Sequence, residues 1–230
     1  HVSETETEIN KSVLDFGLRP FERLGECGIL TKDFVAVHAI HLDESELERI
    51  RHSRVNIVHC PRSNMKLSSG LAHVKKLLAC GVNVGLGTDG PASNNNLDMI
   101  QEMRAAAYVS KVAGVQEESL LINEVLHMAT LGGAGVLGME EQIGSVEVGK
   151  YADVIVVDLT SPHFHPNYHP DSSLLYSAMG SDVRDVFVHG EHVVRDRKIR
   201  TIDLDGVLAD ANRIADAISS NSGITLWGKC

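Results

Sequence analysis

The sequence predicts an α/β fold that begins as a (β/α) barrel and ends in a small β layer with a closing helix. Three short valine-rich runs, at residues 33–38, 54–60 and 81–89, are apolar on both faces, as strands covered on two sides are. Stretches of helical length separate them, and the repeat of roughly 20 to 30 residues suits alternating strands and helices in a barrel. From about residue 143 the pattern changes to paired strands.

The segments between the three runs predict helices. One covers residues 43–53 and another residues 70–81, where Gly81 stands at the expected helix stop. The apolar positions of the second helix share one stripe: Leu71, Val74, Leu77 and Leu78. After the third run, a turn and an asparagine N-cap predict a long helix, with Asp98 and Glu102 near its positively polarised N-terminus.

The later part of the chain predicts a separate β domain. Residues 143–159 and 185–199 are rich in strand-forming residues, and the second stretch is expected to turn back as a hairpin at residues 189–191. Residues 203–220 predict a closing helix. Its expected apolar face holds Val207, Ala211, Ile214, Ala215 and Ile218. We therefore divide the chain into domains 1–142 and 143–230.

Composition excludes several classes of partner. The 230 residues include 21 Lys and Arg against 31 Asp and Glu, a formal net charge of −10, which disfavours nucleic acid and anionic lipid. No apolar run approaches the roughly 18 residues of a membrane span. The four cysteines form no C-x-x-C pair, so neither a disulfide framework nor a cysteine zinc site is expected: Cys27, Cys60, Cys80 and Cys230. We expect a cytoplasmic protein with no nucleic-acid or membrane partner.

Ligand-type side chains end all three predicted barrel strands. His38, His59 and Asp89 stand at these ends, and the opening HVSE places His1 and Glu4 in a similar pattern. A barrel collects its catalytic groups at the carboxyl ends of its strands. Each residue also has a structural reading, since a histidine ending an apolar run can be a core residue and an aspartate before Gly-Pro can be a turn residue. Repetition at successive strand ends favours the functional reading.

Other candidate motifs are weaker. His163, His165 and His169 in PHFHPNYHP could bind a metal, but three prolines in a polar stretch favour an irregular surface loop. GLGTDG lacks the full spacing of a dinucleotide-binding turn. The H-x-E…P-C-x-x-C signature of cytidine-type zinc deaminases, the serine nucleophile elbow and the P-loop are absent from the sequence.

The ordered motifs resemble the amidohydrolase superfamily, and most of all its 5-methylthioadenosine/S-adenosylhomocysteine deaminase branch. The resemblance covers essentially the whole chain, in the blocks HVSET with VHAIHLD, HCPRSNMKLSSG, GVNVGLGTDGPASNNNLDM, ATLGGAGVLG and GSVEVGKYADVIVVD. It is most specific in SNMKLSSG and GTDGPASNNNLDM. This resemblance implies the C-terminal half of a TIM-like (β/α)8 barrel, from the end of strand five through strand eight, with part of a small β-sandwich.

The resemblance also implies roles for individual residues. His1 is similar to the fifth-strand metal ligand and Asp89 to the eighth-strand ligand of one divalent metal, zinc or alternatively iron. Glu4 resembles the acid–base glutamate and His38 the sixth-strand histidine that holds the attacking oxygen. Ser93 resembles a serine that contacts the substrate base, which Glu4 also touches. These residue types fit hydrolytic deamination, because a Lewis-acid metal activates water and a neighbouring acid protonates the heterocycle.

One family feature is missing from its expected place. The H-x-H pair of the first barrel strand is not found, since the one such spacing, His163-Phe164-His165, lies beyond the last predicted barrel strand. We therefore expect the sequence to be cut, either as a fragment of a longer gene product or as an incomplete record, without barrel strands one to four and the body of the fifth. With two of four protein ligands, the 230-residue chain alone is expected to fold poorly and to be inactive, whereas its parent protein is expected to be an active deaminase.

The function predicted is metal-dependent hydrolytic deamination of 5-methylthioadenosine or S-adenosylhomocysteine, which gives the inosine analogue and ammonia. A related amidohydrolase that acts on a triazine, guanine or cytosine-like ring is the alternative within the same class. A non-catalytic fragment or scaffold is the alternative of another class, although a scaffold has no need of Glu4, His38 and Asp89 together. The partners expected are a small heterocyclic or nucleoside substrate and further copies of the chain in a homo-oligomer.

Overall fold

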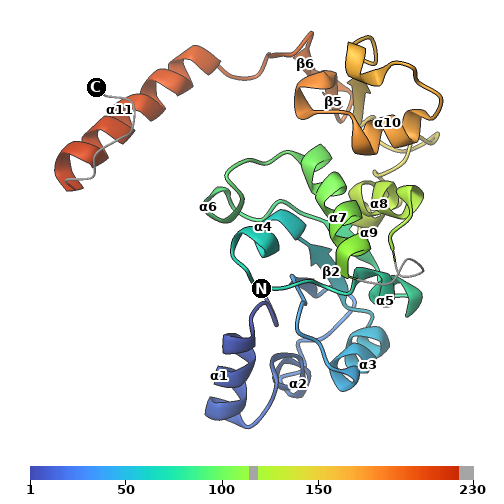
Figure 1. The fold of residues 1–230 in the computed structure, drawn as a ribbon, viewed down its shortest axis with the longest axis vertical. Helices are drawn as coiled ribbons and strands as arrows, with labels where there is room; N and C mark the ends of the chain where they lie inside the picture. The colour runs from blue at the N-terminus through green and yellow to red at the C-terminus, as the bar shows by residue number, and fades with distance from the viewer. Residues whose placement is uncertain (114–118, 223–230) are drawn as a thin grey trace.

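The computed structural model describes residues 1–113 and 119–222, so Cys230 and the end of the predicted second domain lie outside the described residues. Figure 1 shows a body of helices around a short sheet, a smaller group of strands, and a terminal helix set apart from both. In chain order the elements are α1 (Glu6–Phe16), α2 (Pro20–Glu26), β1 (Val35–Val37), α3 (Glu44–Ser53), β2 (Asn56–His59), α4 (Pro61–Lys66), α5 (Val74–Ala79), β3 (Val84–Leu86), α6 (Pro91–Asn94), α7 (Met99–Ala113), α8 (Ile122–Ala129), α9 (Leu131–Val136), β4 (Val154–Val157), η2 (Pro162–Phe164), α10 (Pro170–Tyr176), η3 (Gly180–Asp182), β5 (Val183–Val188), β6 (Glu191–Arg195), β7 (Lys198–Ile199) and α11 (Leu204–Ser222).

The three predicted barrel strands form a parallel sheet in the order β1-β2-β3. Val35 pairs with Asn56, and Ile57 pairs with Val84. The chain start adds one parallel bridge, between Val2 and His38, with the Val2 N–H donating to the Val37 carbonyl at 3.2 Å. Parallel strands with helical crossovers confirm the α/β class. Because the strands are parallel, the residues that follow them all leave at the same edge of the sheet.

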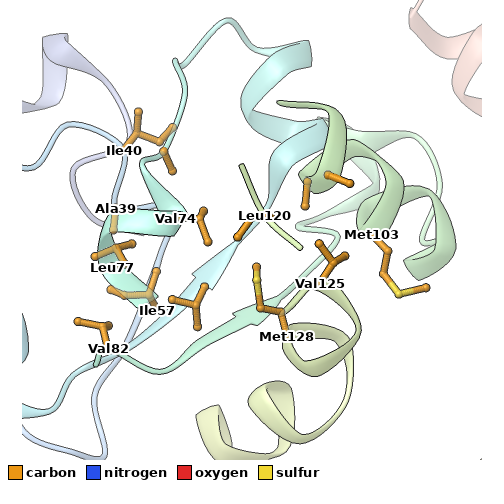
Figure 2. Close-up of a cluster of buried hydrophobic side chains, with 14 of the residues drawn as sticks. Ala39, Ile40, Ile57, Val74, Leu77, Val82, Met103, Leu120, Val125 and Met128 are labelled. Carbon is orange, nitrogen blue, oxygen red and sulfur yellow. The ribbon is translucent and has the colours of Figure 1, made fainter. Parts of the chain in front are cut away.

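Apolar side chains fill the space between this sheet and the helices that follow it. Figure 2 shows Ile57 of β2 near Val74 and Leu77 of α5, with Val125 and Met128 of α8 alongside. All five are buried, and α5, α7 and α8 all contact β3. Burying a side chain of this size contributes about 1.5–3 kcal/mol, so this layer provides a rigid base for the sheet.

The predicted helices are found, with two corrections at their ends. The helix expected over residues 70–81 is α5, which covers only Val74–Ala79, and Leu71 of the predicted stripe is 41% exposed. Gly81 has φ +76°, as a residue after a helix stop does. The long helix does not begin at an asparagine cap: the Asp98 carboxylate accepts hydrogen bonds from Ile100 N–H and Gln101 N–H at 2.9 and 3.2 Å. The short helix α6 occupies the asparagine-rich turn instead.

The later strands form an antiparallel sheet in the order β4-β5-β6-β7. The hairpin is confirmed, since β5 and β6 are joined at residues 189–190, where Gly190 has φ +81°. The strand expected over residues 143–159 is much shorter, because only β4 is extended and paired.

The closing helix is present as α11, but its predicted apolar face is open to solvent. Val207, Ile214 and Ile218 are each at least half exposed, at 51%, 50% and 57%. Figure 1 shows α11 well away from the helices around the parallel sheet. Within residues 1–113 and 119–222, no helix combines the length and the apolar character needed to cross a membrane.

Candidate active site

Two histidines and an aspartate from three separate segments meet at the carboxyl edge of the parallel sheet. The nearest ring nitrogens of His1 and His38 are 3.2 Å apart. Asp89 Oδ1 lies 3.7 Å from His1 Nε2, and Asp89 Oδ2 lies 4.0 Å from His38 Nε2. One ligand atom from each residue fits within a span of 4.8 Å, and this is the group of three found in the described part of the chain. Imidazole nitrogen and carboxylate oxygen are the donors that zinc and iron bind.

Glu4 brings a second carboxylate to the same point. Its Oε2 lies 3.6 Å from His38 Nε2, and its Oε1 accepts a hydrogen bond from the Ser69 hydroxyl at 2.9 Å. The Glu8 carboxylate accepts hydrogen bonds from Ser3 N–H and Glu4 N–H at 2.9 and 2.7 Å. These hydrogen bonds hold both the backbone between Val2 and α1 and the carboxylate of Glu4, so Glu4 stays directed at His38.

The His38 ring is held by a buried amide. His38 Nδ1 lies 2.8 Å from Asn64 Oδ1, and the two side chains are almost completely buried. An amide oxygen only accepts hydrogen bonds, so Nδ1 donates to Asn64, and in the neutral ring Nε2 then presents its lone pair toward His1, Glu4 and Asp89. Asn64 thus selects the tautomer that faces the site.

Two hydroxyl groups hold Asp89. Ser63 and Ser93 both donate to Asp89 Oδ2, at 2.7 and 2.6 Å, which leaves Oδ1 directed toward His1. Partial burial raises the pKa of the Asp89 carboxyl, but the Ser93 and Ser63 hydrogen bonds, a backbone N–H and nearby His38 together bring its pKa below the ordinary value. Asp89 is therefore a carboxylate at neutral pH, as a metal ligand must be.

Backbone strain gathers at the same place. Ser3, His38 and Asp89 have φ angles of 53°, 76° and 58°, in the left-handed region that residues with a side chain rarely adopt. Each costs on the order of 1–3 kcal/mol and persists only where surrounding contacts hold it. Three strained residues from three segments indicate that the precise direction of these side chains is maintained against local preference.

The structure does not bring the other histidine candidates into this group. His59 ends β2 with its side chain almost fully buried, its Nδ1 has no hydrogen-bond partner within the described residues, and burial, aided by nearby His38, lowers its pKa to about 4. His163 instead pairs with Asp182 at 3.0 Å in the largely irregular PHFHPNYHP stretch. Burial, with help from Asp89 and Glu102, raises the pKa of the Cys60 thiol to about 12, so this cysteine is not a nucleophile.

Sequence reasoning assigned no role to several residues that support the site. Ser63, Asn64 and Ser69 follow β2 in the block SNMKLSSG, whose motif resembles the family without giving a role to each residue. The sequence predicts that Glu102 is a charge complementing a helix N-terminus, yet its side chain is fully buried. The signal that could have found the serines and the asparagine is their position directly after a strand that ends at the candidate site.

The chain belongs to the amidohydrolase family, whose model matches residues 1–193. Within that family it is similar to the 5-methylthioadenosine/S-adenosylhomocysteine deaminase of Syntrophobacter fumaroxidans, with 47% identity over 218 residues, or 95% of this chain and 50% of the relative. These matches confirm the resemblance inferred from the motifs. The chain spans about half the length of the curated relatives it matches.

Solved structures agree with this assignment. A zinc-bound adenosine deaminase from Xanthomonas campestris is 39% identical, with a TM-score of 0.93 over 96% of this chain and 50% of that chain. A zinc complex of atrazine chlorohydrolase from Arthrobacter aurescens is 26% identical, with a TM-score of 0.85 over 91% of this chain and 46% of that chain.

Proposed function

We propose that the natural protein containing this chain is a metal-dependent hydrolase that deaminates adenine nucleoside thioethers. The substrates are 5-methylthioadenosine and S-adenosylhomocysteine, and the products are the inosine analogue and ammonia. The observation that carries the proposal is the meeting of His1, Glu4, His38 and Asp89 at one sheet edge. Relatives named as deaminases of these substrates, at 40–47% identity, support it.

The donor set supports a divalent metal at this edge. His1 and Asp89 would hold it, since each directs a donor atom toward the other and Asp89 is ionised. Zinc is the metal proposed, with iron as the alternative, because the X. campestris adenosine deaminase binds zinc and the nitrogen and oxygen donors suit both ions. Such a cation supplies a Lewis acid that makes water nucleophilic near neutral pH.

The remaining groups would move protons and hold charge. Glu4 would protonate a ring nitrogen of the adenine, which makes C6 open to attack by water. The His38 Nε2 lone pair would hold the attacking water and orient it toward C6. Asp89 would accept one proton from that water and pass it to the departing amino group, so that ammonia leaves as the C–N bond breaks. The second proton of the water would return to Glu4 as the new C–O bond becomes a carbonyl, which replaces the proton that Glu4 gave to the ring. Ser93 would lie beside the base, with its hydroxyl also on Asp89.

The same proposal includes the larger architecture. Residues 1–142 would contribute the end of strand five through strand eight of a (β/α)8 barrel, and residues 143–230 part of a β-sandwich domain with its closing helix. The parallel order β1-β2-β3, extended by the Val2 bridge, supports this arrangement. The cytoplasmic setting and the homo-oligomer stay predictions from the sequence.

Activity assays test the proposal in the longest natural protein that contains this chain. Ammonia release is measured with 5-methylthioadenosine, S-adenosylhomocysteine, adenosine and a chlorotriazine, and we expect the two thioethers to give the highest kcat/KM. Glu4→Gln and Asp89→Asn should each abolish turnover, whereas Glu48→Gln, at an exposed carboxylate on α3, should not. The 230-residue chain alone should be inactive.

Other outcomes select the alternatives. Preference for the chlorotriazine would favour the triazine reading, which the similarity to atrazine chlorohydrolase supports. Full turnover in Glu4→Gln and Asp89→Asn would end the proposed mechanism. Absence of turnover on any ring, together with stoichiometric binding of a protein partner, would favour a scaffold.

A further inference from the structure

A buried carboxylate outside the proposed catalytic group connects the segments that hold it. Glu102, in the first turn of α7, has no exposed side-chain surface. Its Oε2 accepts a hydrogen bond from Arg62 N–H at 3.3 Å, and its Oε1 accepts one from Asn94 Nδ2 at 2.6 Å. The Arg62 guanidinium lies 3.7 Å from Oε1. If Glu102 only complemented the N-terminus of α7, its carboxylate could stay in solvent, where a charge is not desolvated. Its complete burial therefore needs another explanation.

Each of these contacts falls next to a serine that binds Asp89. Arg62 precedes Ser63 in α4, and Asn94 follows Ser93 in α6. The same Asn94 amide also donates to the Thr88 carbonyl at 2.5 Å, directly before Asp89. One carboxylate therefore fastens both turns that direct a hydroxyl at Asp89 Oδ2.

We propose that Glu102 is a positioning residue that fixes the Asp89 carboxylate by clamping the α4 and α6 turns through Arg62 N–H and Asn94. The inference rests on the proposed role of Asp89 as a metal ligand. Asp89 has φ +58°, and a strained residue needs such outside restraint to keep its direction. Contacts behind metal ligands typically change metal affinity about 10- to 100-fold when removed.

The acceptor chemistry of Glu102 makes the test selective. Its three close polar contacts are all donors: a backbone N–H, an amide NH₂ and a guanidinium. Glutamine has the same shape but directs its own NH₂ at one of these donors, so Glu102→Gln breaks one half of the clamp without leaving a cavity. Met103→Ala is the matched control, because Met103 is a buried neighbour on α7 that packs in the apolar core.

The experiment measures the zinc dissociation constant by chelator competition in the longest natural protein that contains this chain. We expect Glu102→Gln to weaken zinc binding about 10- to 100-fold and Met103→Ala to lower the thermal midpoint with unchanged zinc affinity. In a Ser63→Ala/Ser93→Ala background, Glu102→Gln should weaken zinc binding no further, since its effect passes through those hydroxyls. Full additivity in that background, or wild-type affinity in Glu102→Gln, would overturn the proposal.

A second measurement needs neither metal nor substrate. Amide hydrogen exchange over residues 88–95 should become faster in Glu102→Gln and stay at the wild-type rate in Met103→Ala. Unchanged exchange in Glu102→Gln would overturn the clamp even if the protein held no zinc. Zinc binding without deamination would instead end the proposed function and leave the clamp to be judged by affinity and exchange.

Discussion

Replacing Asn64 tests whether the tautomer of His38 matters. In Asn64→Leu the side chain keeps its branching and its number of non-hydrogen atoms but loses the oxygen that lies 2.8 Å from His38 Nδ1. The ring then either keeps a buried N–H without an acceptor or moves its proton to Nε2. In the second case, Nε2 would direct a donor instead of a lone pair at the centre of the site.

The expected magnitude follows from the burial of both partners. A buried donor left without a partner costs about 1–3 kcal/mol, so the free energy of unfolding should fall by up to that amount. If the proton moves to Nε2 instead, the ring loses the same 1–3 kcal/mol of free-energy preference for the tautomer with its proton on Nδ1. At 1.36 kcal/mol for each factor of ten, kcat should fall roughly 5- to 150-fold.

Nitrogen-15 NMR of labelled histidine, together with steady-state kinetics on the longest natural protein, provides the assay. Asn64→Leu should lose the Nδ1–H signature of His38, and Asn64→Asp, which retains an acceptor, should keep that signature and recover part of the rate. Asn83→Leu is the control, because Asn83 makes amide hydrogen bonds at the far end of the sheet, to Asn56 and Gly132. An unchanged His38 signature and rate in Asn64→Leu would refute the reasoning.

Three further predictions concern the surroundings of the site. Ser69→Ala removes the hydroxyl that lies 2.9 Å from Glu4 Oε1, and because removing one partner of a buried hydrogen bond costs about 1–3 kcal/mol, kcat should fall about 5- to 150-fold in the ammonia-release assay. His59 is protonated more easily unfolded, at pKa 6.5, than folded, at about 4, so stability should be lost as pH falls between these values. The difference between these two pKa values is worth about 3 kcal/mol, and His59→Gln should remove this part of the pH dependence in urea unfolding. Gly87→Ala would place a Cβ 2.7 Å from a valine methyl on β2 and should lower the free energy of unfolding by about 1–3 kcal/mol, whereas Gly90→Ala, which meets nothing within 4 Å, should change it little.

Each of these predictions has a contrary outcome. Ser45→Ala, at an exposed hydroxyl bonded to Asp43, is the control for Ser69→Ala, and equal rates in the two variants would show that Ser69 does not orient Glu4. Retention of the full stability loss between pH 6.5 and 4 in His59→Gln would assign that loss to other groups. Equal destabilisation by the two glycine variants would mean that steric contact does not decide the cost.

Much of the fold could be predicted because burial leaves a periodic trace in the sequence. The valine-rich runs at 33–38, 54–60 and 81–89 correspond to β1, β2 and β3, since strands covered on both faces are apolar throughout. The ends of elements were less predictable. Leu71 belongs to a helical stripe by spacing, but the backbone does not become helical before Val74. Spacing records which face is apolar, not where the first hydrogen bond closes.

The residues at the centre of the candidate site could be predicted from the sequence, but their supporting contacts could not. His38 and Asp89 follow β1 and β3, and a parallel sheet brings the segments after its strands together, so their meeting follows from topology. The bridge between Val2 and His38 places His1 beside them. The residues that hold them were not predictable in this way. Ser63 and Asn64 are neighbours on one short helix yet bind different side chains, and Glu102 reaches two other helices. Such contacts depend on tertiary geometry, which leaves no periodic mark in a single sequence.

Because β1, β2 and β3 run in the same direction, the candidate site lies at the carboxyl ends of the strands, and their amino ends form the opposite edge of the sheet. The turns that lead into these strands lie at the opposite end from Asp89 and His38, and Thr31, Lys32 and Asp33 before β1 are exposed. A fluorescent domain or a protease recognition sequence inserted there would be separated from the chemistry by the length of the sheet. That edge is where an engineer could label or divide the polypeptide while retaining the catalytic geometry.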